Sequence, residues 1–205
     1  MTSYKQIFDT HLPILNNGEW QPATLSMAYE TMHQEALDEV GWDVVEYTLD
    51  LPDLLSGLGE DSLLAVDPGY AHTGLAYITD RHVKLWQADI RAGGEFTRPS
   101  SSEIVRRLLV LDETLGFQTD FTVLEDAAFS KGNGQAHLGL VRGVWAGICT
   151  ERLGTAQFLG INQIKKAIGA TKIDFHKASK HYPDAVAAFA IALAGVKMLK
   201  EEEGE

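Results

Sequence analysis

Three carboxylates stand where short apolar segments of the chain end or begin. Asp67 ends an apolar run and precedes a Pro-Gly turn, Glu125 ends a second apolar run, and Asp184 opens an expected C-terminal helix. Clustered carboxylates repel one another unless a cation neutralises them, and hard oxygen ligands suit Mg²⁺ or Mn²⁺. We therefore expect the three acids to converge on divalent cations, although each one alone is most simply a turn residue.

The elements that must position these acids follow a regular pattern from residue 62 onward. Apolar runs predict strands, and apolar positions at helical spacing predict helices. The expected strands are 62–67, 74–79, 82–88, 121–124 and 155–159, and the expected helices are 102–115, 135–153, 162–168 and 183–200. The order βββαβαβα predicts an α/β fold, with a five-stranded mixed sheet flanked by helices.

Charge divides the chain near residue 61. Residues 1–61 hold 12 acidic residues and one basic residue, a net charge of −11, whereas residues 62–200 hold 13 acids and 16 Lys and Arg residues, a net charge of +3. We expect an acidic, partly helical N-terminal extension over 1–61, with a helix at 23–39 and a short strand at 44–51. Residues 62–200 would form the main domain, and the acidic stretch 201–205 a disordered tail.

Composition excludes several classes of protein. No segment reaches the roughly 18 apolar residues of a membrane span, so no membrane partner is expected. The single cysteine, Cys149, rules out an internal disulfide and a multi-cysteine zinc site. The first residues lack a basic region before an apolar stretch, so we expect no secretory signal and a cytoplasmic protein.

Four local sequences occur in a fixed order along the expected domain. They are LAVDPGYAHTG at 64–74, VLEDAAFSKGNGQAHLGLVRGV at 123–144, INQIKKAIGATK at 161–172, and HYPDAVAAFAIA at 181–192. The first places Asp67 at a turn that Gly69 permits, with Gly74 allowing a close approach in the following strand. The last sets His181 three residues before Asp184.

Together these segments resemble the motifs of the RuvC family of Holliday junction resolvases, over roughly residues 62–197. The resemblance implies a ribonuclease-H-like fold and a homodimer that cleaves four-way DNA junctions with two symmetric nicks. It implies two Mg²⁺ ions per site, with Mn²⁺ as an alternative. The implied catalytic and metal-binding residues are Asp67, Glu125, His181 and Asp184. The short stretch between 169 and 184 and the acidic N-terminal extension depart from the family and indicate a divergent member, encoded by a phage, by another mobile element or by a chromosome.

DNA contacts form a second expected set: Phe129, Lys131, Asn133, Lys165, Lys166 and Lys172. Phe129 either stacks on an unpaired base or is a core residue, and the lysines either bind phosphates or form a solvated face. His181 either serves as a ligand or general base, or has no chemical role beside a helix start. Gly139, Gly143 and Gly147 would pack either on the sheet or in the dimer contact.

Two other functions remain open at this point. The same chemistry suits other branched DNA, or RNA. A non-catalytic nucleic-acid-binding scaffold is the alternative of a different class, and its acidic N-terminal extension would recruit a basic protein partner.

Overall fold

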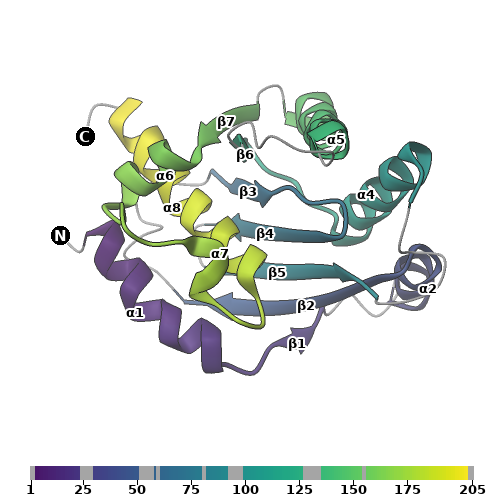
Figure 1. The fold of residues 1–205 in the computed structure, drawn as a ribbon, viewed down its shortest axis with the longest axis horizontal. Helices are drawn as coiled ribbons and strands as arrows, with labels where there is room; N and C mark the ends of the chain where they lie inside the picture. The colour runs from purple at the N-terminus through teal and green to yellow at the C-terminus, as the bar shows by residue number, and fades with distance from the viewer. Residues whose placement is uncertain are drawn as a thin grey trace.

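The computed structural model describes residues 3–23, 30–50, 58, 61–79, 82–91, 99–126, 135–153 and 156–202. The strands are β1 (Gln21–Pro22), β2 (Trp42–Leu49), β3 (Leu63–Asp67), β4 (His72–Ile78), β5 (Val83–Ile90), β6 (Phe121–Asp126) and β7 (Ala156–Gly160). The helices are α1 (Tyr4–Asn17), α2 (Glu30–Val40), α4 (Ser101–Leu115), α5 (Gln135–Leu153), α6 (Ile161–Ile168), α7 (Phe175–Ala178) and α8 (Pro183–Glu202). Figure 1 shows the strands as one sheet with helices beside it.

The sheet has seven strands in the order β1-β2-β5-β4-β3-β6-β7. Neighbours from β1 to β3 are antiparallel, while β3, β6 and β7 run parallel. The five strands from residue 62 onward and the helices between them confirm the predicted α/β order. The predicted number of five strands is wrong, because β1 and β2 extend the sheet beyond β5 with residues from the N-terminal extension.

The two faces of β3 belong to different cores. Leu63 and Ala65 pack in the cluster that contains α8, and Leu64 and Val66 pack in the cluster that contains α4 and α5. This alternation follows from the pleat of a strand and leaves the Asp67 side chain on the α8 face. α8 is buried throughout from Ala185 to Val196, which explains its continuous apolar sequence.

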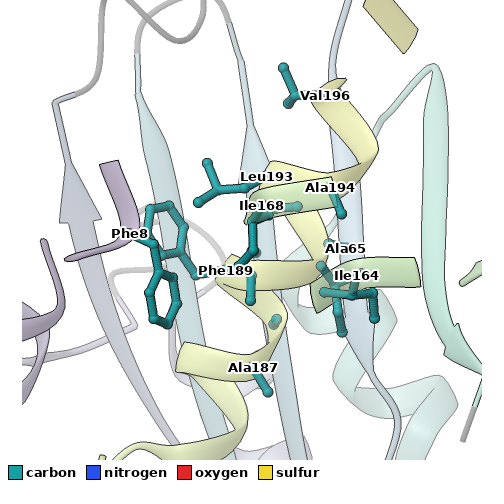
Figure 2. Packing of buried hydrophobic residues seen from close by; sticks show 14 of the residues in the cluster. Phe8, Ala65, Ile164, Ile168, Ala187, Phe189, Leu193, Ala194 and Val196 are labelled. Carbon is teal, nitrogen blue, oxygen red and sulfur yellow. The ribbon is translucent and has the colours of Figure 1, made fainter. Parts of the chain in front are cut away.

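The N-terminal extension is built into both cores. Ser3 caps α1 with Gln6, and the helix buries Phe8 beside Phe189 of α8 (Figure 2). β2 pairs with β5 over its whole length, from Trp42 opposite Ile90 to Leu49 opposite Val83. The sheet therefore runs across the expected boundary near residue 61.

Two predicted elements at the ends of the chain differ in extent. The helix expected at 23–39 is α2, which ends at Val40, and residues 24–29 lie outside the described part. Glu201 and Glu202, expected in a disordered tail, instead continue α8. In the described part of the chain, no helix combines the length and the apolar character needed to span a membrane.

Candidate active site

Asp67 and Glu125 lie side by side at the ends of two parallel strands. β3 and β6 are hydrogen-bonded neighbours, and the last registered pair, Val66 and Leu124, directly precedes the two acids. Val123 packs in the α8 cluster as Ala65 does, so alternation turns both acids toward the α8 face. Their exposed fractions are only 6% and 7%.

His176 completes this group from outside the sheet. The four-residue helix α7 carries it to the two carboxylates, with Nδ1 3.5 Å from Asp67 Oδ2 and Nε2 3.8 Å from Glu125 Oε2. One ligand atom from each of the three residues lies within 4.8 Å of the others. Two carboxylate oxygens and one imidazole nitrogen are therefore close enough to coordinate a single cation.

The ionised form of Asp67 is disfavoured by its surroundings. Burial raises the pKa of its carboxyl well above the usual range, and the negative charges of Glu125 and Asp184 raise this pKa further, against the opposing effect of Arg142. Oδ2 of Asp67 is buried and has no hydrogen-bond partner among the described residues. A buried carboxylate oxygen that accepts no hydrogen bond, beside a second acid and an imidazole, fits a divalent cation, which would supply counter-charge.

Gln87 of β5 places Asp184 at the start of α8. The Gln87 Oε1 accepts the backbone N–H groups of Asp184 at 3.1 Å and Ala185 at 3.0 Å, so it caps the helix. Its Nε2 donates to Asp184 Oδ2 and to Asp89 Oδ1, both at 2.7 Å. Gln87 is 1% exposed, and both ends of its amide are fully used.

Two glycines set the distance between the sheet and α8. A Cβ on Gly74 would lie 1.9 Å from the carbonyl oxygen of Asp184, so only glycine lets α8 begin against β4. A Cβ on Gly69 would lie 1.8 Å from the carbonyl oxygen of His72, and Thr73 Oγ1 donates to the Gly69 carbonyl at 2.7 Å. The turn after Asp67 is therefore as tight as the Pro-Gly sequence predicted.

These groups surround an open pocket of about 370 Å³. Its lining residues are Asp67, Pro68, Gly69, Tyr70, Ala71, His72, Glu125, Leu138, Arg142, His176 and Asp184. A second potential set of cation ligands, His72, Asp89 and Asp184, adjoins the first. Its members are already linked, since His72 Nδ1 lies 2.8 Å from Asp89 Oδ1 and Gln87 bridges the two acids.

The structure brings Asp67, Glu125 and Asp184 together in this pocket, but not His181. His181 is exposed, does not line the pocket, and has its ring 6.1 Å from that of Tyr182. The structure places His176 next to the acids instead.

The predicted DNA contacts lie outside the pocket or outside the described residues. Lys165 and Lys166 are in the last turn of α6, and Lys165 Nζ lies 5.9 Å from the centre of the Phe175 ring. Lys172 is exposed in the turn after α6. Phe129, Lys131 and Asn133 fall in the segment 127–134, which the structure does not describe.

Sequence reasoning missed three contributors to the site: His176, Gln87 and Arg142. His176 lies on a helix too short to show a periodic pattern. Gln87 occupies an ordinary inward position of a strand, and only the pairing of β5 with β4 brings it under α8. Arg142 stands in the quoted segment 123–144, so its local sequence was the one available signal.

The fold and the cluster of acids together define the structural class of the protein. A mixed sheet of βββαβαβα order, with acids at the ends of two parallel central strands and at the start of the last helix, is a ribonuclease-H-like arrangement. Among solved structures, RuvC of T. thermophilus in complex with a Holliday junction substrate is similar at a TM-score of 0.53 and 20% sequence identity. A second Thermus thermophilus RuvC structure is similar at a TM-score of 0.51 and 19% identity.

Each comparison covers 69% of this chain and 96% of the RuvC chain. No protein-family model matches the sequence, and no curated protein matches it. The chain therefore has the RuvC fold, as the motifs predicted, with a divergent sequence and additional residues beyond that fold.

Proposed function

We propose that this chain is a metal-dependent endodeoxyribonuclease that cleaves four-way DNA junctions with two symmetric nicks. The observation that carries the proposal is the buried Oδ2 of Asp67, which accepts no hydrogen bond from the described residues and faces Glu125 and His176 in an open pocket. Its setting on the RuvC fold supports DNA as the substrate, because one of the similar RuvC structures holds a Holliday junction.

Asp67, Glu125 and Asp184 are the proposed ligands of two Mg²⁺ ions, or of two Mn²⁺ ions, with Asp67 shared between them. His176 is the proposed nitrogen ligand, since both of its ring nitrogens approach a carboxylate. The role predicted for His181 from its spacing remains a prediction. When bound, the cations would neutralise the phosphodiester and activate a water for in-line attack.

The residues of the chain itself would orient the reaction. Gln87 fixes the Asp184 carboxylate by donating a hydrogen bond to Oδ2, and so sets the direction from which this acid approaches the pocket. Arg142 lines the same pocket. Its positively charged guanidinium group is suited to contact a phosphate oxygen of the substrate. The pocket is open to solvent, and the turn residues 68–71 form part of its lining.

DNA contacts outside the pocket belong to the proposal as well. Lys165, Lys166 and Lys172 would bind phosphates, which adds affinity without reading base sequence. Phe129, Lys131 and Asn133 remain predicted DNA contacts, with Phe129 stacking on an unpaired base. A basic protein partner for the acidic N-terminal extension, and a cytoplasmic location, also remain predictions.

A homodimer is part of the same proposal, because two symmetric nicks require two sites related by a two-fold axis. α5 offers a face for that contact. A Cβ on Gly139, Gly143 or Gly147 would meet nothing within 4 Å, so these glycines do not pack on the sheet. The sheet is covered instead by Val141 and Trp145. Glycine weakens a helix by about 1 kcal/mol relative to alanine, and close approach of a second helix would compensate for it.

The test is a comparison of substrates under identical conditions. The full chain is incubated with a synthetic four-way junction, a flap, a replication fork and a linear duplex, each with Mg²⁺, Mn²⁺ or EDTA. The proposal predicts cation-dependent cleavage with the junction cut fastest. Equal rates on flap or fork would redirect the function to other branched DNA, and binding of the junction without cleavage under either cation would reject the enzyme.

A further inference from the structure

The segment 175–184 carries two groups of the candidate site, and the first of them stands on little local structure of its own. It contains His176 on α7 and Asp184 at the start of α8. A four-residue helix is far too short to be stable alone, because helix nucleation is costly. The position of His176 therefore depends on what packs against α7 and the turn that follows.

Phe8 of α1 anchors the beginning of this segment. Its ring lies 5.5 Å from that of Phe175 in an edge-to-face arrangement, and 6.1 Å from that of Phe189 in a stacked one. All three rings are at most 1% exposed. The residue before His176 is thus fixed in the core by a helix of the N-terminal extension (Figure 2 shows Phe8 and Phe189).

Asn16 holds the end of α7. Its Nδ2 donates a 3.0 Å hydrogen bond to the carbonyl of Ala178, the last residue of that helix. Terminal carbonyls of a helix have no partner within the helix, so this bond satisfies one of them. It joins two points that are 162 residues apart in the sequence.

Trp20 holds the turn that leads into α8. Its ring stacks on Tyr182 with 4.0 Å between centroids and 25° between planes, and Tyr182 lies two residues before Asp184. The indole itself is held, since Nε1 donates to the carbonyl of Leu15 at 3.1 Å and the ring also contacts Tyr47 at 5.2 Å. The Tyr182 carbonyl accepts the N–H of Val186 at the start of α8.

From these contacts we infer that the N-terminal extension braces the active-site segment, with Asn16 and Trp20 as positioning residues for His176 and Asp184. Neither residue lines the pocket, so each acts through α7 or Tyr182. For its catalytic readout the inference rests on the function proposed above. Its structural readout, amide hydrogen exchange, does not depend on that function, whereas Mn²⁺ binding tests the proposed metal site.

Five variants of the full chain, two of them controls, test the brace. Trp20→Ala removes the stacking, Trp20→Phe keeps an aromatic ring, and Asn16→Ala removes the bond to α7. Ile14→Ala is the control on α1, because Ile14 is 44% exposed. Val44→Ala removes a buried side chain of the N-terminal extension in the opposite core, and so controls for general loss of stability.

Hydrogen exchange is measured well below the lowest Tm of the set, together with Mn²⁺ affinity and single-turnover cleavage of a four-way junction. We expect Trp20→Ala and Asn16→Ala to exchange faster at residues 175–184 but not in β3 or β6. We also expect weaker Mn²⁺ binding and cleavage slowed about 10- to 100-fold, the cost of an ångström-scale misplacement, at unchanged junction affinity. Trp20→Phe should recover most of each loss, and Ile14→Ala should match the wild type.

Unchanged exchange at 175–184 in both Trp20→Ala and Asn16→Ala would overturn the inference. So would the same local change in Val44→Ala, which would make the effect one of overall stability. A wild-type chain that cuts no junction would reject the proposed function, while hydrogen exchange would still decide for or against the brace.

Discussion

Gln87 holds Asp184 by both its backbone and its side chain, accepting the N–H of Asp184 at 3.1 Å and donating to its carboxylate at 2.7 Å. The amide thus links a buried position of β5 to the first turn of α8. Only the carboxamides of Gln and Asn offer an acceptor for two N–H groups together with two donors, and Asn is shorter by one methylene.

Replacing Gln87 should therefore damage both stability and the site. Gln87→Leu leaves the N–H groups of Asp184 and Ala185 without their cap, and each unsatisfied buried group costs about 1–3 kcal/mol. We expect a loss of about 2–4 kcal/mol in the free energy of unfolding, with cleavage reduced even where the protein is folded. Denaturant unfolding and single-turnover cleavage provide the measurements. Gln157→Leu, at an exposed position of β7, is the control, and equal behaviour of the two variants would contradict this role for Gln87.

Asp67→Asn should stabilise the protein when no divalent cation is present. The native pKa of Asp67 lies above its unfolded value, so the folded state binds more protons between the two pKa values, and stability falls as pH rises through that window. The amide cannot ionise and avoids this loss. We expect its Tm to exceed that of the wild type by about 2–4 °C at pH 7 in EDTA, which is about 1 kcal/mol for a chain of this size.

The difference in Tm between Asp67→Asn and the wild type should depend on pH. The advantage of Asp67→Asn should vanish near pH 4, where the wild-type carboxyl is protonated in the folded state and increasingly so in the unfolded one. Mn²⁺ should raise the Tm of the wild type more as the pH rises, because the cation competes with the proton for the Asp67 carboxylate, and should raise that of the variant little. A variant less stable than the wild type at pH 7 in EDTA would show that the folded protein does not disfavour the ionised form of Asp67.

Replacing His176 and replacing His181 should affect metal binding differently. Because His176 lies within 4 Å of Asp67 and Glu125, His176→Ala should weaken Mn²⁺ binding by about 10- to 100-fold, as the loss of groups around a metal commonly does. His181→Ala should leave Mn²⁺ affinity near the wild-type value. Calorimetric titration of both variants decides between them, and the reverse ranking would favour the histidine chosen by motif spacing.

The exposed glycines of α5 predict a dimer that a bulky side chain weakens. Gly143→Leu favours the helix itself by about 1 kcal/mol, so loss of dimer cannot be ascribed to a less stable α5. Light scattering over a concentration series should show a higher dissociation constant for this variant than for Glu113→Leu, which adds the same side chain at an exposed position of α4. A wild-type chain that stays monomeric, both free and bound to a junction, would contradict the homodimer.

The fold from residue 62 onward could be predicted because its strands are short apolar runs and its helices are periodic. The same alternation that buries Leu63 and Ala65 directs Asp67 toward α8, and the parallel pairing of β3 with β6 brings Glu125 beside it. The N-terminal strands were harder. β2 carries acids at Asp43 and Glu46 that blur its alternation, and its pairing with β5 is a contact between distant parts of the chain.

Other parts of the site could not be predicted for reasons of length and context. α1 contains Pro13, which argues against a helix in any local reading of the sequence. α7 has four residues, too few for a periodic signal. The approach of His176 to the acids is therefore set by tertiary packing, in which Phe175 of α7 contacts Phe8 of α1. The motif spacing that selected His181 says nothing about how the turn before α8 is oriented.

The most direct test of the central claim maps the cleavage of a four-way junction, strand by strand, by the wild type and by Asp67→Asn. The account predicts paired nicks at symmetry-related positions with Mg²⁺ or Mn²⁺, and none in EDTA. It predicts that Asp67→Asn binds the junction as tightly as the wild type but cuts it at least about a thousandfold more slowly, since a lost ligand carboxylate removes several kcal/mol of transition-state stabilisation. Nicks of the wild-type pattern and rate from Asp67→Asn would show that the cluster around Asp67 is not the active site.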